Sequence, residues 1–264
     1  MSLRIGLFGG GVVGGGVYDL LQRFTLNQQF SKAHGVNLEI VKICVRSLDK
    51  PRDFKVDDSK TKIVTDYQEI LSDPSINCVV ELIGGTTQAK TIVFEAIRAG
   101  KHVVTANKAL IASHLDEIQA ELNKFPNVRF AYEAAVCGSI PIIHSLQTDF
   151  VANNIHKITG IMNGTTNFML SKMEDEGSEY ATVLKEAQAL GFAEADPTAD
   201  VEGHDVQAKI AILAKLAFGQ TIPVPQIPTS GISKISKVDF EYAKILKSTI
   251  KLLGTAAINP ETKS

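Results

Sequence analysis

The chain has 264 residues, 44% of them hydrophobic, and a formal net charge of -2. A chain of this size and composition can bury a substantial core in one or two domains. The near-neutral charge and the lack of an apolar run of roughly 20 residues argue against nucleic-acid partners and membrane spans.

The first predicted elements are a strand, a glycine-rich turn and a helix. Residues 3–8 form an apolar run, Gly9, Gly11 and Gly14 fit G-x-G-x-x-G, and helical periodicity follows at once. In dinucleotide sites such glycines allow a tight turn, close approach of the backbone to a pyrophosphate, and close packing of helix on strand. A helix N-terminus also attracts anions. The segment therefore predicts a cofactor site, with a ligand-free turn as the alternative.

The expected apolar helix face is Val13, Val17, Leu20, Leu21 and Phe24. The predicted cofactor-binding residues are Gly9, Gly11, Val12, Val13 and Gly14.

The second predicted strand, over residues 38–45, indicates which nicotinamide cofactor is preferred. It ends at Arg46, and a charged segment over residues 47–62 is expected to form a loop. An acid at such a strand end is typical of NAD sites, whereas an arginine can bind the extra phosphate of NADP. Arg46 therefore favours NADP, with NAD possible. The alternatives are a solvated Arg46, and Asp49 as the ribose-binding acid.

Strands and helices then alternate along the first half of the chain. Strands are expected over residues 77–83, 102–105 and 128–132, and helices over residues 86–98 and 110–124. This alternation predicts a parallel sheet covered by helices on both faces, with right-handed crossovers. The fold class is therefore α/β, with a Rossmann-type, doubly wound dinucleotide-binding domain over residues 1–145.

Lys108 lies just after the strand expected at residues 102–105. The carboxyl ends of parallel strands are where ligands bind in such sheets. Lys108 could thus contact cofactor or substrate, or it could be an exposed lysine following a helix-starting Asn107.

A second cluster runs from Tyr132 to Pro141. Glu133 is its only acid, and small apolar residues and Gly138 follow. Irregular backbone here would place carbonyl oxygens beside a carboxylate, and such ligands suit a hard cation. From the residues alone, a packed loop beneath the nucleotide domain is the favoured interpretation.

The second half of the chain has the character of an α+β domain, expected over residues 146–264. A strand is predicted over residues 155–161 and helices over residues 179–190, 200–218 and 240–253. The helix over residues 200–218 has apolar residues on one stripe. A proline-containing loop is expected over residues 223–228.

Two further clusters in this half could carry chemistry. The turn over residues 163–167 could bind a carboxylate, or it could simply cap a helix. Asp205 and Lys209 lie four residues apart and would share a helix face. A lysine beside an acid can exchange a proton with an alcohol or carbonyl, although a surface ion pair is the favoured alternative on this evidence alone.

These clusters, in this order, resemble homoserine dehydrogenase. The resemblance extends over about the whole chain, and the stretches that carry it are residues 9–17, 104–110, 132–143, 161–170 and 189–214. It implies NAD(P)-dependent interconversion of L-homoserine and L-aspartate 4-semialdehyde, in the biosynthesis of threonine and methionine. It also implies a homodimer, in which the second domain binds substrate and forms much of the contact.

The resemblance assigns roles to particular residues. Lys209 matches the proton donor or acceptor, Asp205 its partner, and Lys108 a lysine that touches cofactor and substrate. The implied substrate-binding residues are Glu194, Asp200, Gly164 and Thr165. Some members bind sodium through residues that match Glu133, Val136, Gly138 and Ile140, which favours the cation site over the packed loop.

The chain departs from the family pattern in two places. Cys137 stands at a position that is often glycine. Family members also continue with further strands after the point that matches Ser264, so we expect a substrate domain truncated at its C-terminus and no regulatory amino-acid-binding domain. A strand is expected to begin at Ala256. The alternatives are another aldehyde reductase or amino-acid dehydrogenase on this fold, and an NADP-binding sensor or inactive partner.

The three cysteines are scattered along the sequence, at Cys44, Cys78 and Cys137. They form neither a metal-binding spacing nor a disulfide framework. The N-terminus leads directly into a strand and a glycine turn, without a signal-peptide cleavage pattern. These features predict a cytoplasmic protein.

Overall fold

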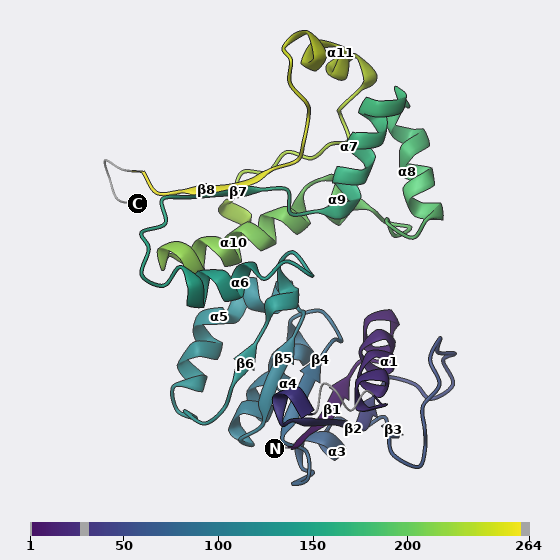
Figure 1. Ribbon diagram of the computed structural model, residues 1–264, viewed down its shortest axis with the longest axis vertical. Coiled ribbons are helices and arrows are strands. Elements are labelled where there is room, and N and C mark those ends of the chain that lie inside the picture. Colours follow the sequence, from purple (N-terminus) through teal and green to yellow (C-terminus); the bar gives the residue numbers. More distant parts are fainter. Residues whose placement is uncertain (1, 27–31, 260–264) are drawn as a thin grey trace. The chain divides into compact units, whose positions relative to one another are not determined.

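The computed structural model describes residues 2–26 and 32–259. The chain divides into two compact units between Ala135 and Val136, whereas the boundary expected from the sequence falls after residue 145. Both units can be followed in Figure 1. No helix among the described residues is long and apolar enough to cross a membrane.

The first unit is built on a parallel sheet. Its strands are β1 (Ser2–Phe8), β2 (Asn37–Cys44), β3 (Lys62–Val64), β4 (Cys78–Glu81), β5 (His102–Thr105) and β6 (Phe130–Ala131). Their order is β3-β2-β1-β4-β5-β6, and every neighbouring pair is parallel. This order, which reverses between β1 and β4, is that of the doubly wound dinucleotide-binding fold. The α/β prediction is therefore confirmed.

Burial of the strands explains why their sequences read as apolar runs. β4 is buried along its whole length, as expected for a strand covered on both faces of a parallel sheet. The helices that follow the strands are α1 (Val12–Leu26), α3 (Gln68–Leu71), α4 (Thr87–Arg98) and α5 (Lys108–Leu122). In α4 the buried residues recur at helical spacing, at Ala89, Ile92, Val93, Ala96 and Ile97.

The face of α1 that packs on the sheet differs from the predicted one. Val13 and Leu20 are 60% and 52% exposed, whereas Tyr18 is buried. Val17 and Leu21 pack against the core as expected, and the side chain of Phe24 lies outside the described part of the structure. The Tyr18 hydroxyl accepts a hydrogen bond from the backbone N–H of Asp57 at 2.9 Å, so a tyrosine with its polar end satisfied replaces leucine in the packing face.

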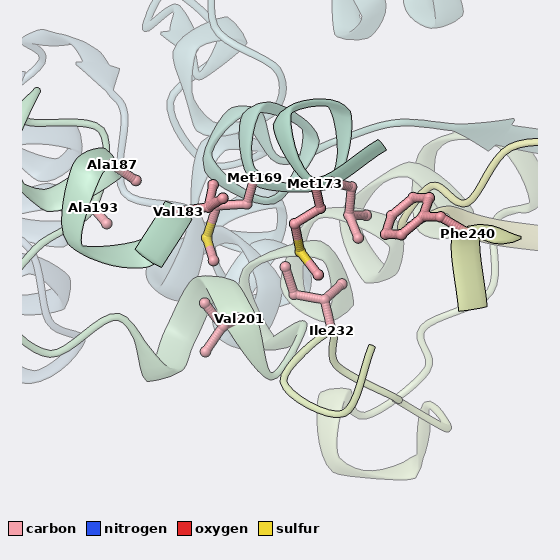
Figure 2. Packing of buried hydrophobic residues seen from close by; sticks show 9 residues of the cluster. Met169, Met173, Val183, Ala187, Ala193, Val201, Ile232 and Phe240 are labelled. Atoms are coloured by element: carbon pink, nitrogen blue, oxygen red, sulfur yellow. The ribbon is translucent and has the colours of Figure 1, made fainter. Parts of the chain in front are cut away.

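The second unit combines helices with a small sheet. β7 (Lys157–Gly160) and β8 (Gly254–Ala257) pair antiparallel. The helical elements include α6 (Ile142–His144), a π-helical turn (Ser145–Asp149), α7 (Gly164–Glu176), α8 (Tyr180–Ala189), α9 (Thr198–Val201), α10 (His204–Phe218) and α11 (Lys237–Ile245). α7, α8, α9 and α11 surround one core, to which Met169, Met173, Val183, Val201 and Phe240 contribute (Figure 2).

Two predicted helices of this unit were wrong in extent. The helix expected over residues 200–218 is broken into α9 and α10 at Gly203, whose φ of 82° lies in the left-handed region that glycine prefers. The helix expected over residues 240–253 is α11, which begins earlier because Ser236 and Asp239 form a capping box. α11 ends at Ile245, and Lys247 then adopts a φ of 51°.

Candidate functional site

The glycine turn of the first unit is shaped by close backbone contacts. Gly9 has a φ of 109°, and a Cβ there would lie 2.7 Å from the carbonyl oxygen of Leu82. A Cβ on Gly14 would overlap the carbonyl oxygen of Gly9. Any side chain at either position would thus force the turn open, so the structure requires the two outer glycines of the motif.

A pocket opens at the carboxyl ends of β1, β2 and β4. Its lining includes Gly9, Gly10, Gly11, Arg46, Leu82 and Ile83. The backbone N–H of Gly15 donates to Gly11 at 2.8 Å, which starts the hydrogen bonding of α1 beside the pocket. Val12 and Val13 are exposed in this first turn. Backbone N–H groups and a helix N-terminus that border a pocket in this way could bind an anion.

Cationic side chains border the pocket where β2 ends. Arg46 and Lys50 are exposed and line it. Arg52 also lines the pocket, and its guanidinium donates to the carbonyl oxygens of Leu48 at 3.2 Å, Lys50 at 3.0 Å, and Ser47. Arg52 therefore holds the loop that carries Arg46 and Lys50. The sequence indicated positive charge here, but it gave no sign that one arginine shapes the loop.

Lys108 begins α5 beyond the end of β5. The Asn107 side-chain oxygen accepts from the backbone N–H of Leu110 at 3.1 Å, so Asn107 is the N-cap of this helix. Its amide nitrogen donates to the carbonyl oxygen of Gly85 at 2.7 Å. Lys108 itself is half-buried.

Glu81, the last residue of β4, is a buried acid that the sequence did not indicate as a site residue. Its only sign in the sequence is that an otherwise apolar strand ends in an acidic residue.

In the second unit, α10 presents an acid and a lysine one turn apart. The Lys209 ammonium donates to the Asp205 carboxylate and to the carbonyl oxygen of Met162, both at 2.7 Å. Asp205 is 4% exposed, and the Lys209 side chain is 15% exposed. The surface ion pair favoured from the residues alone is therefore wrong. Burial leaves the Asp205–Lys209 ion pair little screened by water.

Asn163 connects this pair to a second acid. Its amide nitrogen donates to Asp200 at 2.6 Å and to Asp205 at 2.9 Å. Its amide oxygen accepts from the backbone N–H and the hydroxyl of Thr166, at 2.8 Å and 3.0 Å. Capping α7 thus fixes which end of the amide faces the acids. The sequence suggested the cap, but the contact with two acids, 37 and 42 positions away, could not be read from it.

The remaining predicted substrate residues lie outside this hydrogen-bond network. The Thr165 hydroxyl donates to the carbonyl oxygen of Phe192 at 2.6 Å, which ties the first turn of α7 to the segment leading to Glu194. Gly164 opens α7 and is exposed. Glu194 is also exposed, and within the described ranges its carboxylate has no hydrogen-bond partner. The structure therefore joins Asp200, Asp205 and Lys209, and leaves Glu194 open to solvent.

The expected cation loop has the irregular backbone that was predicted. Cys137 and Ser139 adopt left-handed φ angles of 49° and 73°, so cysteine at position 137 takes a conformation that glycine prefers. Burial raises the pKa of the Cys137 thiol, while the nearby Lys209 ammonium acts to lower it. No group of three or more His, Cys, Asp or Glu able to hold a metal occurs in the described part of the chain.

Two family models match the chain. The model described as homoserine dehydrogenase, NAD binding domain, matches residues 9–133, and the model described as homoserine dehydrogenase matches residues 141–263. A homoserine dehydrogenase from Pseudomonas aeruginosa is 45% identical over 254 residues, which are 96% of this chain and 57% of that protein. One from Bacillus subtilis is 43% identical over 97% of this chain and 58% of its own length.

A solved structure shows the same similarity. The homoserine dehydrogenase of Thiobacillus denitrificans matches with a TM-score of 0.88 and 42% identity, over 98% of this chain and 59% of that one. The chain therefore spans less than two thirds of the length of these relatives. The described division between Ala135 and Val136 falls between the two family-model matches.

Proposed function

Because the chain belongs to the homoserine dehydrogenase family, we propose that it catalyses the NAD(P)-dependent interconversion of L-homoserine and L-aspartate 4-semialdehyde. The observation that carries the proposal is the buried Asp205–Lys209 pair on α10. A lysine paired with a carboxylate can donate a proton to an aldehyde oxygen, and can take it back in the reverse direction.

The pocket of the first unit would suit a nicotinamide dinucleotide, because Gly9 and Gly14 permit a tight turn beside it, in which a Cβ at either position would strike a backbone carbonyl oxygen. When bound, that cofactor supplies the hydride chemistry. The protein supplies the binding site, the orientation of the reactants and the proton. In reduction of the aldehyde, Lys209 protonates the carbonyl oxygen, and Asp205 together with the Met162 carbonyl aims the ammonium.

The substrate amine is held by acids of the second unit in this proposal. Asp200 has one carboxylate oxygen on Asn163 and is half-buried, so it can accept from an ammonium while its orientation stays fixed. Glu194 is exposed and supplies a second negative charge. The Thr165 hydroxyl holds the segment that leads to Glu194 through its hydrogen bond to the carbonyl oxygen of Phe192. Gly164 precedes Thr165 in the first turn of α7.

NADP is the proposed preferred cofactor. Arg46 and Lys50 border the pocket and Arg52 shapes their loop, so a phosphate on the adenosine ribose would meet two cations at this edge. Lys108, which opens α5, is proposed to touch cofactor and substrate. We extend the proposal to a sodium ion held by Glu133, Val136, Gly138 and Ile140, since oxygen donors of this kind suit a hard cation.

The decisive experiment is a steady-state assay of homoserine oxidation with NADP and with NAD, each with sodium and with potassium. The proposal predicts turnover, a lower KM for NADP, and a higher rate with sodium. Arg46→Ala should raise the KM for NADP at least tenfold while changing that for NAD little. Arg23→Ala, on the exposed surface of α1, is the control and should change neither. Binding of NADP without turnover of homoserine or the semialdehyde would contradict the proposal and favour an NADP-binding sensor.

A cytoplasmic homodimer is part of the same proposal. All three cysteines are unpaired in the structure, as is usual in reducing compartments. The dimer rests on the family resemblance, and closed two-fold dimers are the commonest oligomers. Light scattering should give twice the mass of the 28.5 kDa chain, and a monomeric mass at assay concentration would contradict it.

A further inference from the structure

Glu81 is a fully buried acid at the carboxyl end of β4, the end of the sheet where the pocket opens. It is the last residue of β4 and is 0% exposed. One carboxylate oxygen accepts from the backbone N–H groups of Ile83 at 2.9 Å and Gly84 at 3.3 Å. The other accepts from the Thr105 hydroxyl at 2.7 Å. Within the described residues, no lysine or arginine forms an ion pair with it.

Burying a carboxylate without a cation is costly, because the charge loses its hydration. The donors that offset this cost come from two different places. Two belong to the loop over residues 82–85, and the third, Thr105, ends the neighbouring strand β5, with which Glu81 pairs in register. An acid that only filled space could be replaced by an apolar residue at lower cost, so the carboxylate is best explained by the two segments it joins.

The contacts of Thr105 close a ring. Its hydroxyl oxygen also accepts from the backbone N–H of Asn107 at 3.0 Å, and Asn107 donates back to the carbonyl oxygen of Gly85 at 2.7 Å. Glu81 thus holds the beginning of the 82–85 loop directly, and the end of that loop through Thr105 and Asn107. Gly84 and Gly85 both have left-handed φ angles, and a Cβ on either would meet nothing within 4 Å. Leu82 packs against the core of the sheet, whereas this end of the loop has no side-chain packing to fix it.

The ring lies at the proposed cofactor site. Leu82 and Ile83 line the pocket, and Lys108 follows Asn107 at the start of α5. We propose that Glu81 is a positioning residue, whose carboxylate fixes the 82–85 loop against the N-terminus of α5 and so holds the pocket wall and Lys108 in place for the dinucleotide. This inference rests on the proposed function.

Paired substitutions test the ring. Glu81→Gln keeps the shape and an oxygen for the loop N–H groups, but its amide is a donor where Thr105 also donates. Thr105→Val removes the hydroxyl at nearly constant shape, whereas Thr105→Ser keeps it. Glu95→Gln, a hydrogen-bonded acid on α4 away from the strand ends, is the matched control. Melting temperatures establish that each variant folds.

We expect Glu81→Gln and Thr105→Val each to weaken NADPH binding about tenfold and to lower kcat, with a smaller change in the KM for homoserine. The double variant should be no worse than either single one, because both break the same ring. Thr105→Ser and Glu95→Gln should behave as wild type. Hydrogen exchange at the amides of Asn107 and Leu110 should accelerate in Glu81→Gln and Thr105→Val without any ligand.

The exchange measurement separates this inference from the proposed function. If wild-type protein binds NADPH but turns over neither substrate, the proposed activity fails, while binding and exchange still test Glu81. If Glu81→Gln does not fold, the Thr105→Val and Thr105→Ser pair decides. Unchanged exchange and unchanged NADPH affinity in folded Thr105→Val would overturn the positioning role.

Discussion

The two units build their candidate sites in different ways. In the first unit the glycine turn beside the pocket is made of backbone, and its essential glycines lie within six positions of one another, from Gly9 to Gly14. In the second unit it is made of side chains, and Lys209 meets the carbonyl oxygen of a residue 47 positions away. A backbone site is thus recorded in local spacing, whereas a side-chain cluster exists only once the chain has folded. Glycine substitutions should therefore have their largest effect in the first unit, and substitutions of polar side chains in the second.

The largest expected effect is in the glycine turn. Gly14→Ala places a methyl group against the carbonyl oxygen of Gly9, so the turn must shift, and we expect NADPH binding to fall below detection by calorimetry. Gly16→Ala is the matched control, because a Cβ there meets nothing within 4 Å. It should bind normally and raise the free energy of unfolding by about 0.5–1 kcal/mol, as alanine does in a helix interior. Equal binding by the two variants would contradict the account.

The next largest effect should appear in the second unit. Lys209→Ala removes the proposed proton donor, and kcat should fall by about 10²–10⁴ while NADPH affinity stays within twofold. The same substitution at Lys215, a half-buried position near the end of the same helix, should leave kcat unchanged. A wild-type kcat in Lys209→Ala would rule out the proton-transfer role. A loss of NADPH binding in the same variant would contradict the expectation that Lys209 acts on the substrate and not on cofactor binding.

A smaller effect should follow at Asn163. Asn163→Asp replaces an amide that donates to two acids with a third carboxylate. Like charges then repel, and we expect a loss of about 1–3 kcal/mol of unfolding free energy at pH 7 together with a raised KM for homoserine. Both effects should diminish as the pH falls and carboxylates become protonated. Asn154→Asp, on the exposed surface of the same unit, should change neither quantity. Thermal unfolding and steady-state kinetics against pH check this.

The smallest effect tests a side-chain contact in the first unit. The Lys42 ammonium, 2.9 Å from Asp73, holds the pKa of that carboxyl well below its usual range, together with hydrogen bonds from Ser75. A lowered folded-state pKa stabilises the protein above the unfolded value of about 3.9 and loses this contribution as the pH falls below it. Asp73→Asn should therefore cost roughly 1 kcal/mol at pH 7 and progressively less below about pH 4. Urea unfolding at several pH values would show this, and an equal cost at all pH values would contradict it.

The parts of the fold that the sequence predicted are those governed by local spacing. The strand at His102–Thr105 and the alternation of strands and helices follow from short apolar runs separated by helical periodicity. The break at Gly203 could not be predicted, because it depends on a left-handed turn. The packing of Tyr18 in place of Leu20 depends on its hydroxyl reaching the backbone of Asp57, 39 positions away.

The candidate site shows the same limit. The glycine motif and the four-residue spacing of Asp205 and Lys209 were readable, because each lies within one element. The residues alone favour a surface ion pair, because the burial of a lysine cannot be seen in a helical pattern that places it next to an apolar stripe. The sequence indicated Asn163 as part of a possible binding or capping turn, but not its contact with Asp205, and it did not indicate Glu81, because the partners of both residues lie on other elements.

The most direct test of the account is a crystal structure of the protein with NADP and L-homoserine bound. If Lys209 is the proton donor, the homoserine hydroxyl will lie within hydrogen-bond distance of its ammonium, about 2.6–3.2 Å, with the substrate amine on Asp200. Homoserine bound with its hydroxyl away from Lys209, or separated from it by packed protein, would contradict the account.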